Sequence, residues 1–550
     1  MGGSRSLLSS ALAAAAALAA VGGPADPARA AESCAGLAGL SLPGLAVTLT
    51  EELPAGTPHP TPGQPALPAH CRLQGKLDQR TGADGKPYAI GFEIRMPVEW
   101  EGRFLFQGGG GNDGRILPAV GRNNTDALNQ GFAVATTDAG HTAEPVPVVG
   151  DQLFGLDPQA RLDYGYRAVN RVAGVAKRII RRRYGEPAHH AYFDGCSNGG
   201  RQGMVASQRF PDLFDGIVAG APGFDLPSAA VAQAWDTQAL AAIAPEGDGG
   251  RPILSQALSD ADLQLVAQGV LKACDARDGL ADGIVADPGG CRFDPSVLRC
   301  RGGATEGCLA PEKVRAIERV FDGAKNSAGR RLYASWPYDP GIAAPGWRDW
   351  KLGTSTTSAP NARNVVLGGP SLAYVFTTPP TRTTDPYGYL LGFDFDRDAR
   401  RIFATSGTFR QSAEEFMTAK STDLAPFRRS GGKLILYHGV SDPVFSADDT
   451  TGYYERVRGR FGAEATRDFA RLFLVPGMNH CGGGPATSVL NFLPAIVAWV
   501  EQGKAPNRVV AAAPDTAPWP GRTRPLCPFP RYPRYDGSGS VERAGNFDCR

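Results

Sequence analysis

The sequence predicts an α/β protein: a mostly parallel sheet with helices on both faces, into which a large lid domain is inserted. Between residues 86 and 220, strand-like stretches such as YAIGFEIRMP and FAVATTDAG alternate with helix-like ones such as DYGYRAVNRVAGVAKRIIRRRYG. This alternation is typical of parallel βαβ units. It returns at KLILYHGVSDPVF and RLFLVPGMNH but is missing from about 226 to 395. An insertion into one sheet explains this better than two consecutive domains, because the pattern resumes after it.

The length and charge of the chain set limits on its organisation and partners. A chain of 550 residues is too long for one ordinary hydrophobic core. We therefore expect the sheet domain in two parts, 31–225 and 396–550, around a lid domain at 226–395. The 57 basic and 55 acidic residues leave a net charge of +2, without a long run of one sign. This balance argues against a nucleic-acid or membrane partner and favours a small ligand.

Residues 1–30 have the layout of a secretory signal peptide. Arg5 precedes an alanine-rich apolar run from Leu7 to Val21, and Ala28-Arg29-Ala30 forms a small-x-small cleavage site. The run is too short for a membrane anchor, which needs about 20 apolar residues. We therefore expect a secreted or periplasmic protein.

Export would place the cysteines in an oxidising compartment, where their even number of ten favours five disulfides. The spacing predicts the pairs Cys34–Cys71, Cys274–Cys291, Cys300–Cys308 and Cys527–Cys549. Cys196 and Cys481 remain for a fifth bridge.

The segment Gly195-Cys196-Ser197-Asn198-Gly199 matches the motif G-x-S-x-G. A strand ends before it at Phe193 and a helix begins near Gly199, which is the context of the nucleophile turn in α/β-hydrolases. The alternative is a glycine-rich turn in which Ser197 only caps a helix. The context favours a nucleophilic Ser197 in an α/β-hydrolase fold with a large inserted lid domain.

In this fold the acid and then the base follow the serine along the chain. His438 and His480 are the histidines beyond Ser197. His480 follows the strand LFLVPGMN in a loop, where the base belongs, whereas His438 lies at a strand end and is interpreted as structural.

The strand before that of His480, KLILYHGVSD, ends at Asp442, which is the predicted acid. Asp448 and Asp449 compete for this role, but they open the helix-like stretch DDTTGYYERV and suit a helix N-terminus. In the predicted mechanism Ser197 attacks an acyl carbonyl, His480 transfers the proton, and Asp442 fixes the imidazole tautomer.

An oxyanion needs N–H donors that are already oriented. The amide of Asn198, directly after the serine, is one candidate, and FLFQGGGGNDG offers Gly108 to Gly111, of which Gly110 and Gly111 are the predicted donors. A phosphate cradle is the rival interpretation, but neither a P-loop Lys-Ser/Thr nor a helix-opening G-x-G-x-x-G is present in the sequence.

A second cluster, CDARDGLADGIVADPGGC, spans residues 274–291 of the lid. Three carboxylates and two carbonyls could surround a hard divalent ion there; a solvated acidic loop is the alternative. The predicted ligands of a structural Ca²⁺ are Asp275, Asp278, Leu280, Asp282 and Ile284. No organic cofactor is expected.

At these residues the sequence resembles the tannase/feruloyl esterase family of secreted α/β-hydrolases. The likeness rests on the Cys-Ser and His-Cys pairs at 196–197 and 480–481, the calcium loop and the cysteine spacing. It implies Ser197, Asp442 and His480 as triad, a Cys196–Cys481 bridge, calcium at the loop, and a lid that closes over an aromatic acyl group.

Stretches such as WRDWKLG and ARLFLVPGMNHC are also similar to the mono-(2-hydroxyethyl) terephthalate hydrolases of that family. In those enzymes a lid arginine, followed a few residues later in the sequence by an aromatic residue, binds the free carboxylate of the substrate. The segment NARNVVLGGPS places Asn364 and Gly368 at these two positions, so that Arg363 would serve only after a shift of register. Trp350 and Phe445 are suited to packing against an aromatic ring.

The sequence thus predicts a secreted serine esterase that hydrolyses esters of aromatic acids. Hydrolysis of synthetic aromatic monoesters, such as mono-(2-hydroxyethyl) terephthalate, is the alternative within the enzyme class. A catalytically silent binding protein on the same fold is a third possibility, against which the complete Ser, Asp and His set argues.

Overall fold

The structure is a computed structural model that describes residues 1–2, 31–122 and 125–550. The expected signal peptide therefore lies outside the described residues, apart from the first two. Among the described residues, no helix combines the length and the apolar character needed to cross a membrane.

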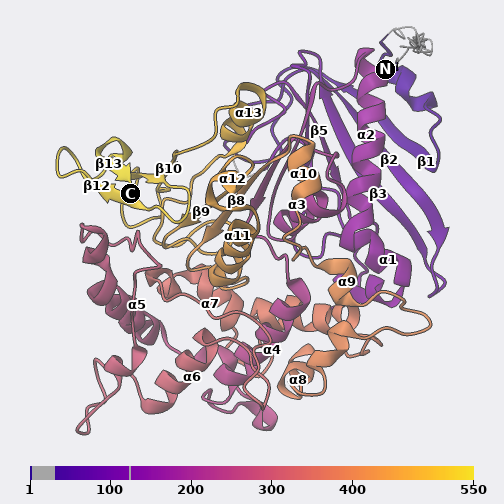
Figure 1. Ribbon diagram of the computed structural model, residues 1–550. Coiled ribbons are helices and arrows are strands. Elements are labelled where there is room, and N and C mark those ends of the chain that lie inside the picture. Colours follow the sequence, from indigo (N-terminus) through magenta and orange to yellow (C-terminus); the bar gives the residue numbers. More distant parts are fainter. Residues whose placement is uncertain (3–30, 123–124) are drawn as a thin grey trace.

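A nine-stranded sheet forms the centre of the molecule, in the order β1-β2-β3-β5-β4-β6-β7-β8-β9 (Figure 1). The strands are β1 (Leu45–Leu53), β2 (His70–Thr81), β3 (Pro87–Pro97), β4 (Arg103–Gln107), β5 (Phe132–Thr137), β6 (His190–Cys196), β7 (Gly216–Gly220), β8 (Lys433–Gly439) and β9 (Ala470–Val475). The pairs from β1 to β5 are antiparallel, and those from β5 to β9 are parallel. The predicted mostly parallel α/β sheet is confirmed.

Helices cover both faces of the sheet. The helices are α1 (Pro158–Leu162), α2 (Ala168–Tyr184), α3 (Asn198–Arg209), α4 (Leu226–Ala241), α5 (Asp260–Cys274), α6 (Pro311–Phe321), α7 (Pro345–Lys351), α8 (Pro386–Leu391), α9 (Ala413–Met417), α10 (Ala425–Arg429), α11 (Ala447–Phe461), α12 (Ala463–Arg467) and α13 (Leu493–Gln502). α2, α3 and α11 pack on one face, and α13 packs on the other.

The sequence of α2 shows why these elements form. Val172, Ala176 and Ile179 follow one another at spacings of three or four residues, so that they share the face buried against the sheet. The helix ends at Gly185, whose φ of 84° is left-handed and suits a residue without a side chain.

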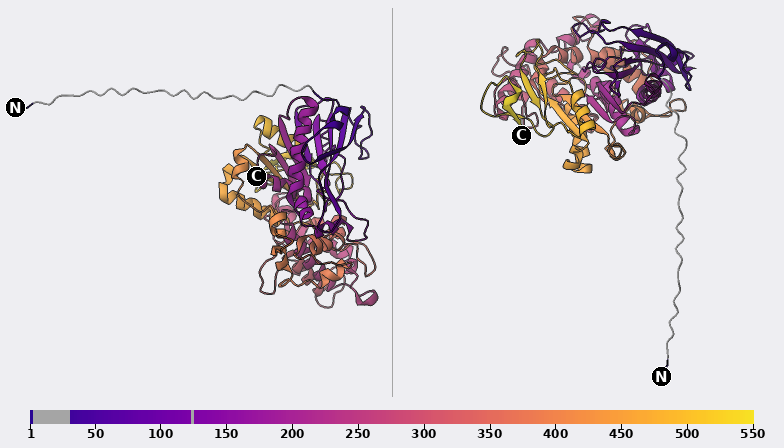
Figure 2. Two further views of the ribbon diagram at one scale, coloured as in Figure 1. Left: turned by 90° about the vertical axis from the view of Figure 1, so that its right-hand side faces the viewer. Right: turned by 90° about the horizontal axis from the view of Figure 1, so that it is seen from above.

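The chain leaves the sheet after β7 and re-enters it at β8. Residues 221–432, all of which the structure describes, contribute no strand to this sheet. Helices α4 to α8 form a separate layer at one end of the sheet, and the left-hand view of Figure 2 shows the same arrangement (Figures 1 and 2). Ser197 follows the carboxyl end of β6, and residues of α4 and α7 line the same cavity as Ser197. This layer therefore lies over the end of the sheet that carries the predicted nucleophile.

Two small antiparallel sheets lie beyond the large one, near the C-terminus. One pairs β10 (Val509–Ala512) with β11 (Thr523–Leu526), and the other pairs β12 (Pro533–Tyr535) with β13 (Phe547–Cys549). All ten cysteines lie among the described residues and form the five disulfides that the spacing predicts.

Candidate active site

Ser197 lies in a tight turn between β6 and α3. Its backbone has φ 67° and ψ −126°, a conformation that side-chain-bearing residues rarely adopt. The turn is possible because glycines surround it: a Cβ on Gly200 would lie 2.3 Å from the carbonyl oxygen of Gly220. A Cβ on Gly195 would lie 2.7 Å from the backbone of Gly199. The serine is thereby held at the tip of the turn.

His480 connects Ser197 to Asp442. Its Nε2 is 2.8 Å from Ser197 Oγ, and its Nδ1 is 2.8 Å from Asp442 Oδ2. The other carboxylate oxygen of Asp442 accepts the N–H groups of Val444 and Phe445 at 2.8 and 3.2 Å. Burial would raise the pKa of Asp442, but the nearby His480 and His438 together outweigh it and hold that pKa below its usual range. The three predicted triad residues therefore form one hydrogen-bonded chain.

The residues that compete for these roles point elsewhere. His438 is completely buried, and its ring nitrogens are 2.8 Å from Thr450 Oγ1 and 3.0 Å from the carbonyl oxygen of Phe445. Asp448 accepts a hydrogen bond from Ser335 at 2.9 Å. His438 also packs against the acid, because its Nε2 lies 3.4 Å from Asp442 Oδ2.

The bridge between Cys196 and Cys481 lies directly behind the nucleophile and the base. The two Cα atoms are 6.0 Å apart although 285 residues separate them along the chain. The bridge joins the residue before Ser197 to the residue after His480.

Ser197 and His480 open into a cavity of about 640 Å³ between the sheet domain and the lid. Trp350 and Phe445 meet the His480 ring edge to face, with centroid distances of 5.6 and 5.4 Å. The other apolar lining residues are Leu117, Leu226, Ala230, Val366, Leu367, Phe376 and Val444. Flat apolar walls of this kind suit an aromatic ring close to the serine.

Arg363, and not Asn364, reaches this cavity. The Arg363 guanidinium lies 5.7 Å from the ring centre of Trp350, and its side chain lines the cavity. Asn364 is completely buried in the turn Asn364–Gly368. The helical turn thus directs residue 363 into the cavity and residue 364 into the interior, so that the arginine at this place stands one position before Asn364.

The glycine-rich loop after β4 lines the cavity. No acceptor in the described part of the chain binds the N–H groups of Gly110 and Gly111, and both residues line the cavity. Asn198 is the first residue of α3, so its N–H has no acceptor within the helix. These three amides are the predicted oxyanion donors.

Two residues near this loop had escaped the sequence-based prediction. Arg122 Nη1 donates to the carbonyl oxygens of Gly108 and Gly109 at 3.2 and 2.7 Å. Asp113 is buried and accepts a hydrogen bond from the side chain of Asn198 at 2.6 Å. The one available signal was the position of Asp113, two residues after the glycine run.

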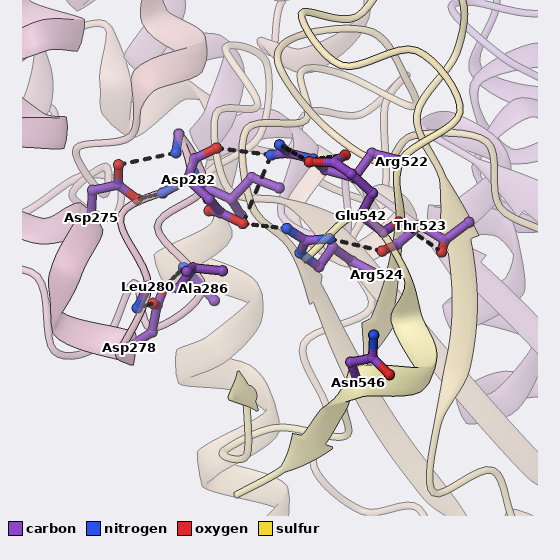
Figure 3. Close-up of polar contacts among 12 residues, drawn as sticks. Asp275, Asp278, Leu280, Asp282, Ala286, Arg522, Thr523, Arg524, Glu542 and Asn546 are labelled. Atoms are coloured by element: carbon purple, nitrogen blue, oxygen red, sulfur yellow. Dashed lines mark hydrogen bonds and ion pairs between the residues drawn. The ribbon is translucent and has the colours of Figure 1, made fainter. Parts of the chain in front are cut away.

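The loop 274–291 is closed by the disulfide Cys274–Cys291. Asp275 accepts the N–H groups of Asp282 and Gly283, and Asp278 accepts those of Leu280 and Ala286 (Figure 3). The Asp282 carboxylate points to Arg524, with which it forms an ion pair (Figure 3). Burial, together with the neighbouring carboxylates, raises the pKa of Asp278 to about 7.

These loop residues offer oxygen ligands of the type that calcium prefers, but they are not gathered around one point. Asp278, Leu280, Asp282 and Ile284 line a cavity of about 220 Å³ against the C-terminal segment, whereas Asp275 does not. In the described part of the chain, no three His, Cys, Asp or Glu side chains converge closely enough to hold a metal ion.

Comparisons with known proteins agree with the fold. The family model described as "Tannase and feruloyl esterase" matches residues 71–550. A mono(2-hydroxyethyl) terephthalate hydrolase of Piscinibacter sakaiensis is 46% identical, over 88% of this chain and 85% of that protein. A probable feruloyl esterase of Arthroderma benhamiae is 30% identical, over 83% of this chain and 81% of that protein.

A solved structure is similar over almost the same extent. The crystal structure of feruloyl esterase B from Aspergillus oryzae aligns with a TM-score of 0.76 and 26% identity, covering 94% of this chain and 99% of that one. Because the family model and these relatives cover most of the chain, the protein belongs to the tannase and feruloyl esterase family of ester hydrolases.

Proposed function

We propose that this protein is a serine esterase that hydrolyses esters of aromatic carboxylic acids through Ser197, His480 and Asp442. The observation that carries the proposal is the hydrogen-bonded chain of these side chains, which opens into a cavity walled by Trp350 and Phe445. The names of the relatives, a terephthalate monoester hydrolase and feruloyl esterases, support the same substrate class.

The reaction follows from the contacts of His480 with Ser197 on one side and Asp442 on the other. His480 Nε2 accepts the proton of Ser197 Oγ while that oxygen attacks the ester carbonyl. The amides of Asn198, Gly110 and Gly111 stabilise the negative oxygen of the tetrahedral intermediate. His480 then donates the proton to the leaving alcohol, and a water molecule hydrolyses the acyl-enzyme by the same steps. Throughout, Asp442 accepts a hydrogen bond from the Nδ1–H group of His480 and remains ionised.

The experiment is an assay of purified protein with methyl ferulate, methyl gallate and mono-(2-hydroxyethyl) terephthalate, with Ser197→Ala as the control. We expect hydrolysis of at least one ester by the wild-type protein and a loss of about 10⁶-fold in kcat for the variant. If both proteins are equally inactive on every ester, the protein is a silent member of the fold and the proposal fails.

A second candidate substrate is the terephthalate monoester, which carries a free carboxylate. Arg363 favours it, because its guanidinium lines the cavity and forms no ion pair within the described part of the chain. Replacement of Arg363 by Met should lower kcat/KM for the monoester about 10-fold and leave that for methyl ferulate within a factor of two, if the guanidinium pairs with the carboxylate. An equal effect on both esters would exclude this role.

We further propose that the protein is exported and works in the periplasm or outside the cell. Support comes from the signal-peptide pattern of residues 1–30 and from the five disulfides, which persist in oxidising compartments. Edman sequencing of the mature protein from the culture medium and the periplasm should find an N-terminus near Ala31.

Calcium remains a proposal of its own, with a structural role in the lid. Its support is the chemistry of the loop: carboxylates of Asp275, Asp278 and Asp282 lie within a short disulfide-closed segment, and the raised pKa of Asp278 reflects burial and repulsion that a divalent cation would relieve. Binding would require Asp282 to turn away from Arg524. No step of the reaction depends on the ion.

A further inference from the structure

A buried chain of polar side chains connects the loop after β4 with the first turns of α3. Its members are Asp113 from the loop and Asn198, Arg201 and Gln202 from the helix, and each is at most 9% exposed. Buried polar groups are costly unless they are hydrogen-bonded, so the directions of these bonds restrict which residues fit.

Both ends of this chain are occupied by groups that can only donate. At one end Arg201 Nε donates to Asn198 Oδ1 at 2.7 Å, which leaves Asn198 Nδ2 to donate to Asp113 Oδ1 at 2.6 Å. At the other end the Gly109 N–H donates to Gln202 Oε1 at 3.0 Å, which leaves Gln202 Nε2 to donate to Asp113 Oδ2 at 2.9 Å. Two amide groups therefore point their N–H bonds at one carboxylate.

Only a side chain that accepts at both oxygens satisfies this arrangement. An amide at position 113 would place an NH₂ group opposite one of the two side-chain amides. A flip of Asn198 would turn its NH₂ toward Arg201, and a flip of Gln202 would turn its NH₂ toward the Gly109 N–H. Each flip therefore only transfers the contact between two donor groups to another pair of residues, and one such contact always remains.

The same carboxylate contacts the loop that carries the predicted oxyanion donors. A Cβ on Gly109 would lie 2.3 Å from Asp113 Oδ2, so the carboxylate packs directly against the loop backbone. Arg122 Nη1 donates a hydrogen bond to the carbonyl oxygen of Gly109 at 2.7 Å. Because the peptide bond is trans, the N–H of Gly110 in the same peptide unit points away from Arg122.

We propose that Asp113 is a positioning residue for the oxyanion hole. As the common acceptor it fixes Asn198, the residue after the nucleophile, relative to the loop in which Gly110 and Gly111 line the cavity. The inference rests on the proposed function, because only an acyl-transfer reaction forms the oxyanion.

The test is a pair of variants that change the hydrogen-bond directions without changing the shape. In Asp113→Asn the donor conflict displaces the loop, and a displacement of about 1 Å can cost about 10²-fold in rate. We expect kcat for the best aromatic ester to fall at least about 10-fold and KM to change less than about twofold, because the donors act on the transition state.

The double variant Asp113→Asn/Gln202→Glu restores a complementary chain. The new carboxylate at 202 accepts both from the Gly109 N–H and from the new amide at 113, whose oxygen accepts from Asn198. We expect kcat to return to within about threefold of the wild-type value. The two substitutions are therefore strongly non-additive, because Gln202→Glu restores the activity that Asp113→Asn removes.

A transition-state analogue separates positioning from general damage. Phenylboronic acid forms a tetrahedral adduct with a serine nucleophile, so its inhibition constant should rise in Asp113→Asn in proportion to the loss of kcat, whereas that of benzoate should not change. A folded Asp113→Asn with wild-type kcat would overturn the inference.

The double variant keeps the test decisive if the single one does not fold. A folded double variant that remains impaired at least about 10-fold would also overturn the inference. These outcomes differ from a failure of the proposed function, in which the wild-type protein itself would be as inactive as Ser197→Ala.

Discussion

Cys196 and Cys481 are joined by a disulfide that links the residue before the nucleophile to the residue after the base. A serine in such a turn identifies only a large class of hydrolases. The cysteine pair connects two distant loops at the point where the proposed mechanism transfers a proton. The bridge therefore couples the covalent framework of the fold to the 2.8 Å contact between His480 and Ser197.

Removal of this bridge should lower activity before it unfolds the sheet. In the variant Cys196→Ala/Cys481→Ala we expect kcat to fall at least about 10-fold, because a small misplacement of nucleophile and base is costly. The free energy of unfolding should also fall, by up to about 5 kcal/mol according to the chain-entropy model. Ester hydrolysis and thermal unfolding of the same samples measure both.

The bridge Cys300–Cys308 is a matched control, because it closes a short loop in the lid. Cys300→Ala/Cys308→Ala should keep the wild-type kcat. A Cys196→Ala/Cys481→Ala protein of normal rate would contradict the proposed role of the bridge.

Asp442→Asn should reduce kcat by about 10⁴-fold with little change in fold. The N–H groups of Val444 and Phe445 occupy one carboxylate oxygen, so the oxygen of the new amide stays there. The NH₂ group then faces His480 Nδ1, which must accept, and Nε2 carries the proton that it should remove from Ser197. Single-turnover kinetics with an aromatic ester measure the loss, and a variant within 10-fold of wild type would contradict Asp442 as the orienting acid.

The same substitution gives a prediction for the pH dependence of stability. The pKa of Asp442 in the folded protein lies below its usual value of about 3.9. The ionised group therefore stabilises the folded state above about pH 4, and this contribution is lost as the pH falls through the folded-state pKa. The difference in Tm between the wild type and Asp442→Asn should be largest near neutral pH and should shrink below about pH 4.

Much of the fold was predictable from the sequence, because buried parallel strands require uninterrupted apolar runs. β6 and β7 meet this requirement, with Tyr192, Phe193, Ile217 and Val218 in the core. β1 was not predicted, since it lies at the sheet edge, is only partly buried, and carries Glu51 and Glu52.

The triad was predictable, because in this fold the serine, the acid and the histidine follow successive strands in a fixed order along the chain. Ser197, Asp442 and His480 each follow a strand, and the carboxyl ends of parallel strands meet at one edge of the sheet. Asp113 was not predictable, because its partner Asn198 is 85 residues away in the sequence. The direction of a hydrogen bond between them also cannot be inferred from the sequence. The sequence also does not show which of residues 363 and 364 faces the cavity, because the local turn of the helix determines it.

Calcium should raise the thermal stability of the protein if the loop 274–291 binds it. After treatment with EDTA, addition of CaCl₂ should raise Tm, since a ligand at 100 times its Kd stabilises by about 2.7 kcal/mol. Asp278→Asn should abolish the rise. Asp287→Asn, in the same loop but outside the predicted ligand set, should retain it, and an unchanged Tm of the wild type in CaCl₂ would refute the site.

The buried ion pair between Asp236 of α4 and Lys351 of α7 should hold the lid wall next to Trp350. Each side chain is 1% exposed, and Lys351 also lies 4.1 Å from the ring centre of Trp336. Asp236→Asn leaves the lysine charge buried without its partner, which should cost about 3–5 kcal/mol in the free energy of unfolding measured in urea. The double variant Asp236→Leu/Lys351→Met removes both charges and should be more stable than the single one, because the cost arises from the uncompensated charge. Lower stability of the double variant would show that the pair itself, and not the isolated charge, determines the stability of the lid.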